Sequence, residues 1–134
     1  MDRVSEDASE DVDDPDVRLV LDSYAAFARG DIEAAVAPLH PDVEWLEPAE
    51  FPRGGPHRGP AAVAEYLRAS REAWSSLEST PTAYRSGADI VVLHHVAGEQ
   101  TDGTPHSATV VDVFSVVDGL VVRMHAYADP AEVP

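Results

Sequence analysis

The chain has 134 residues, which favours a single domain with one core of moderate size. Its 9 basic residues are all arginine and stand against 25 acidic ones, so the net charge is −16. A surface this acidic repels phosphate groups and disfavours binding to nucleic acids and to anionic membranes. The sequence has neither cysteine nor lysine, which excludes disulfides, thiolate chemistry and Schiff-base catalysis.

The two ends of the chain differ in composition. Residues 1–14 are dominated by Asp and Glu with few apolar side chains, so we expect a disordered acidic tail, with a functional acidic arm as the alternative. The folded domain is then expected over residues 15–134. No apolar stretch reaches the length of a membrane span and no export signal is visible, so a cytoplasmic protein is expected.

Helical periodicity dominates the first half of the domain. Apolar residues at helical spacing predict a helix over residues 17–28, with Pro15 near its start and Gly30 just past its end. Asp31 is suited to cap a second, short helix over residues 32–37. Residues 43–47 favour a short edge strand, and a loop rich in Pro and Gly follows. Pro60 then opens a third amphipathic helix.

From residue 77 onward the pattern changes to strands. We expect these at residues 77–86, 90–100, 106–117 and 120–128. Asp118-Gly119 between two β-branched runs is a strong signal for a tight hairpin. Helices first and an antiparallel meander last indicate an α+β fold.

Several short markers occur in an order and spacing typical of one superfamily. They are Gly30-Asp31-Ile32-Glu33-Ala34, His40-Pro41-Asp42-Val43-Glu44-Trp45, Gly59, Val111-Asp112-Val113-Phe114, Asp118-Gly119 and Tyr127. With them the chain resembles the ketosteroid isomerase-like and SnoaL-like proteins of the NTF2-like superfamily. This resemblance implies an NTF2-like cone, in which three N-terminal helices pack in a curved antiparallel β-sheet that encloses a mostly apolar pocket. It also implies a homodimer formed through the outer face of the sheet.

Glu47 is the first candidate catalytic residue. It ends the short strand and precedes Pro48, where the resemblance places the general base of the isomerases. An apolar pocket raises the pKa of a carboxyl toward working pH, which suits proton abstraction next to a carbonyl. The alternative is a solvated carboxylate at a strand end.

Asp112 is the second candidate. Strand alternation puts it on one face with Ala108, Val110, Phe114 and Val116, where an acid is costly unless it is protonated, paired or functional. The resemblance implies a neutral aspartic acid that donates a hydrogen bond to the substrate oxygen. Pairing with Arg123 on the next strand is the alternative.

His95 is the third candidate. His94 and His95 must face opposite sides of the sheet, and the register implied by the resemblance turns Leu93, His95 and Ala97 toward the pocket. By the same register His125 faces outward. A buried structural role is the alternative for His95.

Tyr24 is the fourth candidate. The isomerases carry an oxygen-binding tyrosine on the first helix, but counting back from Gly30 puts that position at Ser23. Tyr24 lies one residue along, rotated by about 100°. The epoxide-hydrolase relatives fit less well, because Ala126 and His95-Val96-Ala97 occupy the positions of their catalytic acids and arginine.

The remaining expectations concern the ligand. The predicted substrate-binding residues are Trp45, Phe51, Tyr66, Leu93, Val110, Phe114 and Met124. The loop at residues 51–59 is expected to cover the pocket mouth, where Phe51, Arg53 or His57 could touch the ligand. No cofactor and no metal are expected, because the histidines show no ligand spacing.

These residues predict a cofactor-free enzyme that moves a proton next to a carbonyl of a small hydrophobic substrate, steroid-like or polyketide-like. Isomerisation and aldol-type ring closure both fit this chemistry. The alternative is a non-catalytic module on the same fold that binds a small ligand or mediates assembly.

Overall fold

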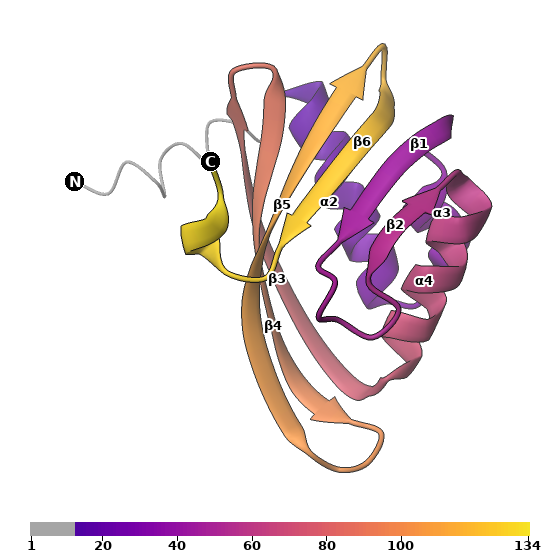
Figure 1. The fold of residues 1–134 in the computed structure, drawn as a ribbon, viewed down its shortest axis with the longest axis vertical. Coiled ribbons are helices and arrows are strands. Elements are labelled where there is room, and N and C mark those ends of the chain that lie inside the picture. Colours follow the sequence, from indigo (N-terminus) through magenta and orange to yellow (C-terminus); the bar gives the residue numbers. More distant parts are fainter. Residues whose placement is uncertain (1–12) are drawn as a thin grey trace.

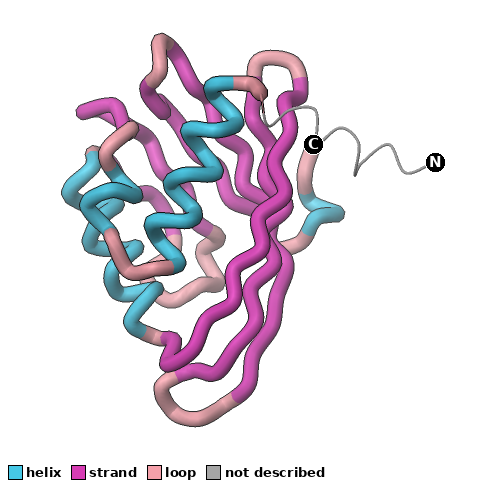
Figure 2. Tube along the Cα trace, turned by 180° about the vertical axis from the view of Figure 1, so that it is seen from behind, coloured by secondary structure: helices cyan, strands magenta, loops and turns pink. Residues whose placement is uncertain are grey.

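A computed structural model of the protein describes residues 13–134 (Figures 1 and 2). The expected acidic tail lies outside these residues, apart from Asp13 and Asp14. The helices are α2 (Pro15–Ala28), α3 (Ile32–Val36) and α4 (Pro60–Glu72), followed near the C-terminus by the 3-10 turn η1 (Pro130–Glu132). The strands are β1 (Leu39–Glu47), β2 (Gly55–Arg58), β3 (Trp74–Ser86), β4 (Asp89–Gln100), β5 (Pro105–Val117) and β6 (Leu120–Tyr127). Between residues 13 and 134, no helix is long and apolar enough to cross a membrane.

The helix boundaries follow from their caps. Asp14 accepts a hydrogen bond from the backbone N of Asp16 at 2.9 Å, and Pro15 occupies the first turn of α2. Beyond the end of α2, Gly30 has a φ of +82°, a left-handed conformation that glycine adopts without strain. Asp31 caps α3 by accepting from the backbone N of Ala34 at 3.1 Å. The predicted helices are confirmed, with α4 ending at Glu72.

The six strands form one sheet in the order β2-β1-β6-β5-β4-β3. The prediction of a purely antiparallel sheet is wrong at one pair, because β1 runs parallel to β6. The expected loop after β1 also contains the short strand β2, which pairs antiparallel with β1. Local sequence carries no signal for either feature, since the partner of β1 lies at the far end of the chain.

The β5–β6 hairpin matches its sequence signal. Asp118 and Gly119 have φ values of 52° and 77°. Positive φ at both central residues matches the twist of the flanking strands. The turn sets the pairs Val117–Leu120 and Val116–Val121, and an irregularity after Ser115 then shifts the register that pairs Asp112 with Ala126.

The helices cover the concave face of the sheet (Figure 2). The core lies between them and is built from fully buried apolar residues, among them Val17 and Val20 of α2, Val43 of β1, Val63 of α4 and Met124 of β6. The hairpin of β4 and β5 extends past the helices at one end of the molecule (Figure 1). One-sided cover of a strongly curved sheet leaves room for a cavity beside the core.

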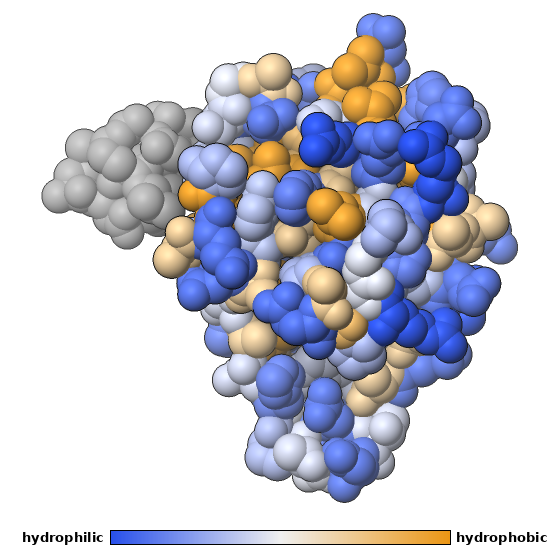
Figure 3. Space-filling model, viewed as in Figure 1, coloured by the Kyte–Doolittle hydropathy of each residue, from blue (hydrophilic) through white to orange (hydrophobic). Residues whose placement is uncertain are grey.

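The opposite face of the sheet is open. Apolar side chains on it gather toward one end and are interspersed with polar ones, whereas the end that carries the β4–β5 hairpin is mostly polar (Figure 3). Among residues 13–134, the exposed large hydrophobic side chains are Leu46 and Val117. Homodimer formation through this face stays a prediction.

The start of α2 is tied to β3 by charge. Arg85 donates from Nε to Asp14 Oδ2 at 2.6 Å and from Nη2 to Asp16 Oδ2 at 2.9 Å. These contacts hold the pKa of Asp14 below its usual value of 3.8.

Replacing Asp14 removes both the cap and the ion pair, so Asp14→Ala is expected to lower the free energy of unfolding by about 1–2 kcal/mol. A group with a lowered native pKa stabilises above its ordinary pKa, and this contribution disappears as pH falls through the native value. The deficit of the variant should therefore shrink in acid. Urea titrations at pH 7 and pH 3 measure it. The exposed neighbour Asp13→Ala is the control, and equal stabilities of the two variants would refute the assignment.

Candidate functional site

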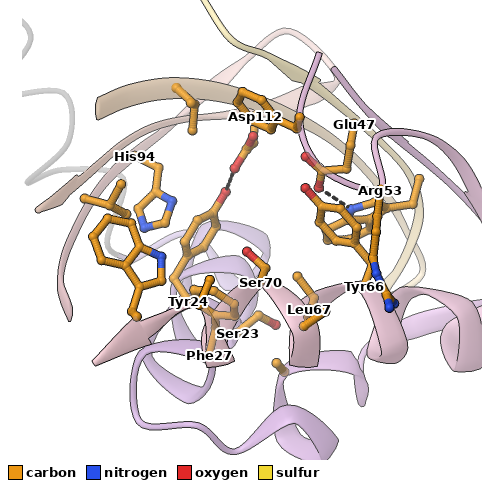
Figure 4. A pocket seen from close by; sticks show the side chains of 18 of the residues that line it. Ser23, Tyr24, Phe27, Glu47, Arg53, Tyr66, Leu67, Ser70, His94 and Asp112 are labelled. Atoms are coloured by element: carbon orange, nitrogen blue, oxygen red, sulfur yellow. Dashed lines mark hydrogen bonds between the residues drawn. The ribbon is translucent and has the colours of Figure 1, made fainter. Parts of the chain in front are cut away.

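A cavity of about 480 Å³ lies between the helices and the concave face of the sheet. Its wall is mostly apolar and includes Val20, Phe27, Leu67, Val110 and Phe114. The polar side chains that line it include Tyr24, Glu47, Tyr66, His94 and Asp112 (Figure 4). An apolar pocket with a few convergent polar groups is the usual form of a small-molecule site.

Tyr24 and Asp112 meet inside this cavity. The Tyr24 hydroxyl, delivered by α2, donates a hydrogen bond to Asp112 Oδ2 on β5 (Figure 4). The Tyr24 ring packs edge-on against His94, with centroids 4.6 Å apart, and against Phe114 at 6.0 Å. Counting back from Gly30 placed the oxygen-binding position at Ser23, but it is Tyr24 that reaches Asp112. Ser23 also lines the cavity wall.

Burial controls the protonation of this pair. Loss of hydration and the nearby Glu47 carboxyl raise the pKa of Asp112 to about 7, although the Tyr24 hydrogen bond opposes the rise. The same burial, together with the charge of Asp112, raises the pKa of Tyr24 well above 10. Tyr24 is therefore a permanent hydrogen-bond donor, whereas Asp112 changes between acid and carboxylate near neutral pH.

Glu47 enters the cavity from the end of β1, across from Asp112 (Figure 4). Trp45, two residues earlier and so on the same face of the strand, donates from Nε1 to Glu47 Oε2 at 2.6 Å. The Tyr66 hydroxyl of α4 is a second hydrogen-bond partner of this carboxyl. Burial raises the pKa of Glu47 and outweighs both hydrogen bonds.

His94 lines the cavity and His95 does not, so the prediction that His95 faces the pocket is wrong. Directly opposed residues of antiparallel strands share a face, and β4 pairs Val92 with Asp112 and His94 with Val110. His94 Nε2 shares a hydrogen bond of 2.7 Å with Ser79 Oγ. Burial and the neighbouring His95 lower the pKa of His94 to about 4, so its ring is neutral at physiological pH. His95 is exposed, and its Nδ1 lies 2.9 Å from Thr109 Oγ1.

Sequence alone could not choose between the two histidines. Residues 90–93 of β4 are apolar without interruption, so alternation gives no facing signal. The direction of each side chain then depends on how β4 pairs with β5 across their turn. A gapless register taken from relatives places this pairing one residue away from the observed one. Such a slip moves every side chain of the strand to the other face.

Most predicted substrate-binding residues lie in the wall: Trp45, Phe51, Tyr66, Val110 and Phe114. Leu93 does not, because it shares the outer face with His95. Met124 does not either, since it is 1% exposed within the core beside the cavity. Trp74, the first residue of β3, also lines the wall.

The alternative partner of Asp112, Arg123, is excluded by register. Asp112 lies opposite Ala126, whereas Arg123 lies opposite Ser115 and is exposed. His125 shares the outer face with Arg123, as predicted, and its ring stacks on Tyr127 with centroids 4.3 Å apart.

Among residues 13–134, no group of three or more His, Asp or Glu side chains is arranged to hold a metal ion. The carboxyls of the cavity are instead held by Tyr24, Trp45 and Tyr66, which are hydrogen-bond donors.

Solved structures with the same fold are known. A structure of TerC co-crystallized with polyporic acid is 28% identical, covers 87% of this chain and 93% of that chain, and has a TM-score of 0.74. An NTF2-like protein of unknown function from Burkholderia pseudomallei is also 28% identical, with coverages of 88% and 93% and a TM-score of 0.76.

A putative SnoaL-like polyketide cyclase from Jannaschia is 16% identical and covers 86% of this chain and 85% of that chain. Its TM-score of 0.74 shows a likeness in fold alone. No curated protein matches the chain. The SnoaL-like domain family matches residues 20–124, which include Tyr24, Glu47, His94 and Asp112. The chain therefore belongs to the SnoaL-like domain family and has an NTF2-like, ketosteroid isomerase-like fold.

Proposed function

We propose that this protein is an enzyme that transfers a proton next to a carbonyl of a small hydrophobic substrate without a cofactor. One observation carries the proposal: a buried carboxyl, Glu47, faces a hydrogen-bonding pair, Tyr24 and Asp112, across an apolar cavity (Figure 4). Proton abstraction next to a carbonyl needs these two functions, a base for the carbon-bound proton and donors for the oxygen.

Glu47 is the base. In its ionised form it takes the proton from the carbon next to the carbonyl, and the electron pair of that C–H bond moves into the enolate. Its raised pKa makes the carboxylate a stronger base than a solvated glutamate. The hydrogen bonds from Trp45 and Tyr66 hold it in place. Because Glu47 ends β1, the rigid sheet positions it.

Tyr24 and Asp112 serve the oxygen. Asp112 donates to it when protonated, and the single hydroxyl proton of Tyr24, which the free protein donates to Asp112, turns to the substrate oxygen when the ligand binds. Both lie in a site of low dielectric, where hydrogen bonds to a developing negative charge are stronger than in water. His94 adds a neutral polar group beside Tyr24 that can contact a second oxygen of the substrate.

The fate of the proton defines the reaction. If Glu47 returns it to another carbon of the enolate, the product is an isomer. If the enolate carbon instead attacks a second carbonyl of the same molecule, a carbon–carbon bond forms, the new alkoxide takes up the proton, and a ring closes. Membership of the SnoaL-like family and the likeness in fold to a putative polyketide cyclase support ring closure, and isomerisation needs the same base and oxygen donors.

A non-catalytic ligand-binding module is the second candidate. It is favoured by the hydrogen bonding already present within the chain: Asp112 is paired with Tyr24, and Glu47 with Trp45 and Tyr66. Polar groups satisfied in this way can simply shape a pocket. The two candidates differ in whether Glu47 accelerates proton exchange.

The first test uses 2-tetralone, a bicyclic ketone with exchangeable protons next to its carbonyl. In D2O the protein is expected to accelerate their exchange, as followed by proton NMR. Glu47→Gln removes the base and should lower the rate by about 10²–10⁴-fold. The control is Glu44→Gln, an exposed glutamate on the opposite face of the same strand, which should leave the rate unchanged. Binding of 2-tetralone without any acceleration would establish the binding module instead.

The second test concerns pH. Below about pH 7 Asp112 carries the proton that it donates to a ketone oxygen, and above it the carboxylate competes for the Tyr24 donor. The affinity for 2-tetralone is therefore expected to fall about tenfold as pH rises through 7. Fluorescence of Trp45 and Trp74, which both line the cavity, reports the binding. Asp112→Asn keeps a donor at every pH and should abolish the decrease. If the affinity of Asp112→Asn still decreases as pH rises, another titrating group causes the decrease.

A further inference from the structure

We propose that the ligand of this cavity carries a carboxylate at the end remote from its reacting carbonyl, and that Arg53 binds this carboxylate at the cavity mouth. The inference rests on the proposed function, since it uses the same cavity. It goes beyond that function by giving the hydrophobic substrate a charged end and by assigning a residue that selects it.

Arg53 places a positive charge at the cavity of a strongly acidic protein. Among the described residues that line the cavity it is the one arginine, and the chain has no lysine. Its side chain lies at the rim beside Tyr66, on the side of the cavity away from Tyr24 (Figure 4). A protein with a net charge of −16 repels anions, so a cation at this rim favours an anion where a ligand enters.

The backbone that carries Arg53 is held firmly. Arg53 has a φ of 60°, and its carbonyl oxygen lies 2.8 Å from His57 Nε2. Arg53 lies within a turn that is closed by a hydrogen bond from the backbone N of Gly54 to Phe51 O at 2.8 Å. A Cβ atom at Gly54 would lie 1.9 Å from the carbonyl oxygen of Pro48, so this turn requires glycine there. The loop therefore fixes where the arginine side chain begins.

The same loop is connected to the candidate base. The His57 ring packs on Tyr66 with centroids 4.8 Å apart, and Tyr66 is a hydrogen-bond partner of Glu47. Arg53, whose carbonyl oxygen contacts His57, and Glu47 are thus both connected to Tyr66. A ligand that lies along Tyr66 can place one end at each.

The existing ion pair of Arg53 is weak enough to leave its guanidinium available for a ligand carboxylate. Its Nη1 lies 3.8 Å from Glu65 Oε1, and the two side chains are 60% and 78% exposed. Such a long, solvated pair contributes little to stability. A carboxylate that bonds two N–H groups of the guanidinium at once forms a stronger contact. It would also remain at the mouth, away from the Glu47 and Asp112 carboxyls.

The test compares two ligands that differ only in this charge: 6-hydroxy-2-naphthoic acid and its methyl ester. The hydroxyl at one end mimics an enol, and the carboxyl lies at the other end. At pH 7 we expect the acid to bind at least tenfold more tightly than the ester, as measured by tryptophan fluorescence. Arg53→Gln should abolish this preference and leave the affinity for the ester unchanged, with the melting temperature confirming that the variant is folded.

The matched control is Arg58→Gln. Arg58 follows on the same hairpin, is exposed, and pairs with Glu44 rather than lining the cavity, so the preference for the acid should persist. A similar loss in both variants would show that only the overall charge matters and would overturn the inference. Glu65→Gln removes the carboxylate that competes for Arg53 and should strengthen binding of the acid. If Arg53→Gln leaves the affinities for acid and ester unchanged, the inference is also overturned.

The outcomes separate this inference from the proposed function. Equal binding of acid and ester, together with tetralone exchange that depends on Glu47, would reject the carboxylate site and leave the enzyme. A preference for the acid that depends on Arg53, without any tetralone exchange, would keep the carboxylate site and reject proton transfer. If neither naphthol binds, the inference fails.

Discussion

The hydrogen bond between Tyr24 and Asp112 joins a helix to a central strand inside an apolar cavity. An acid placed there without a donor would oppose folding, because no water replaces its lost hydration. This hydrogen bond forms only when α2 has one particular position along the sheet and one particular rotation about its own axis. The Asp31 cap and the left-handed Gly30 after α2 help to set that placement. The shape of the cavity, the edge-on contact with His94 and the access to Glu47 all depend on it.

A second constraint is the presence of two carboxyls in one apolar space. Burial raises the pKa of both groups, and the charge of Glu47 makes ionisation of Asp112 still less favourable. Glu47 has two neutral hydrogen-bond partners, Trp45 and Tyr66, and Asp112 has Tyr24. Unequal surroundings of this kind allow one acid to act as a base while the other acts as a donor. His94 stays neutral beside them and adds no charge.

Much of this architecture was predictable, because helix caps, the Asp118-Gly119 turn and the alternation around Asp112 are local signals. The candidate roles of Glu47 and Asp112 stay predictions, although both residues do line the cavity. Long-range pairing was not predictable. The parallel contact of β1 with β6 has no local signature, and the uniformly apolar start of β4 hid the register that turns His94 inward. Tyr24 was uncertain for a related reason, since a count along one helix says little about its rotation against a sheet.

The parallel pairing of β1 with β6 also has a consequence for folding. It joins Glu44 to Arg123, so a very long loop must close before the edge of the sheet is complete. Contacts between residues so distant in the chain form slowly, because chain entropy is lost before they can stabilise anything. Synthesis from the N-terminus makes β6 available only after the other five strands of this sheet. The wall that brings Glu47 opposite Asp112 is therefore among the last parts of the molecule to assemble, and an incompletely folded chain can contain every helix and still have no binding site.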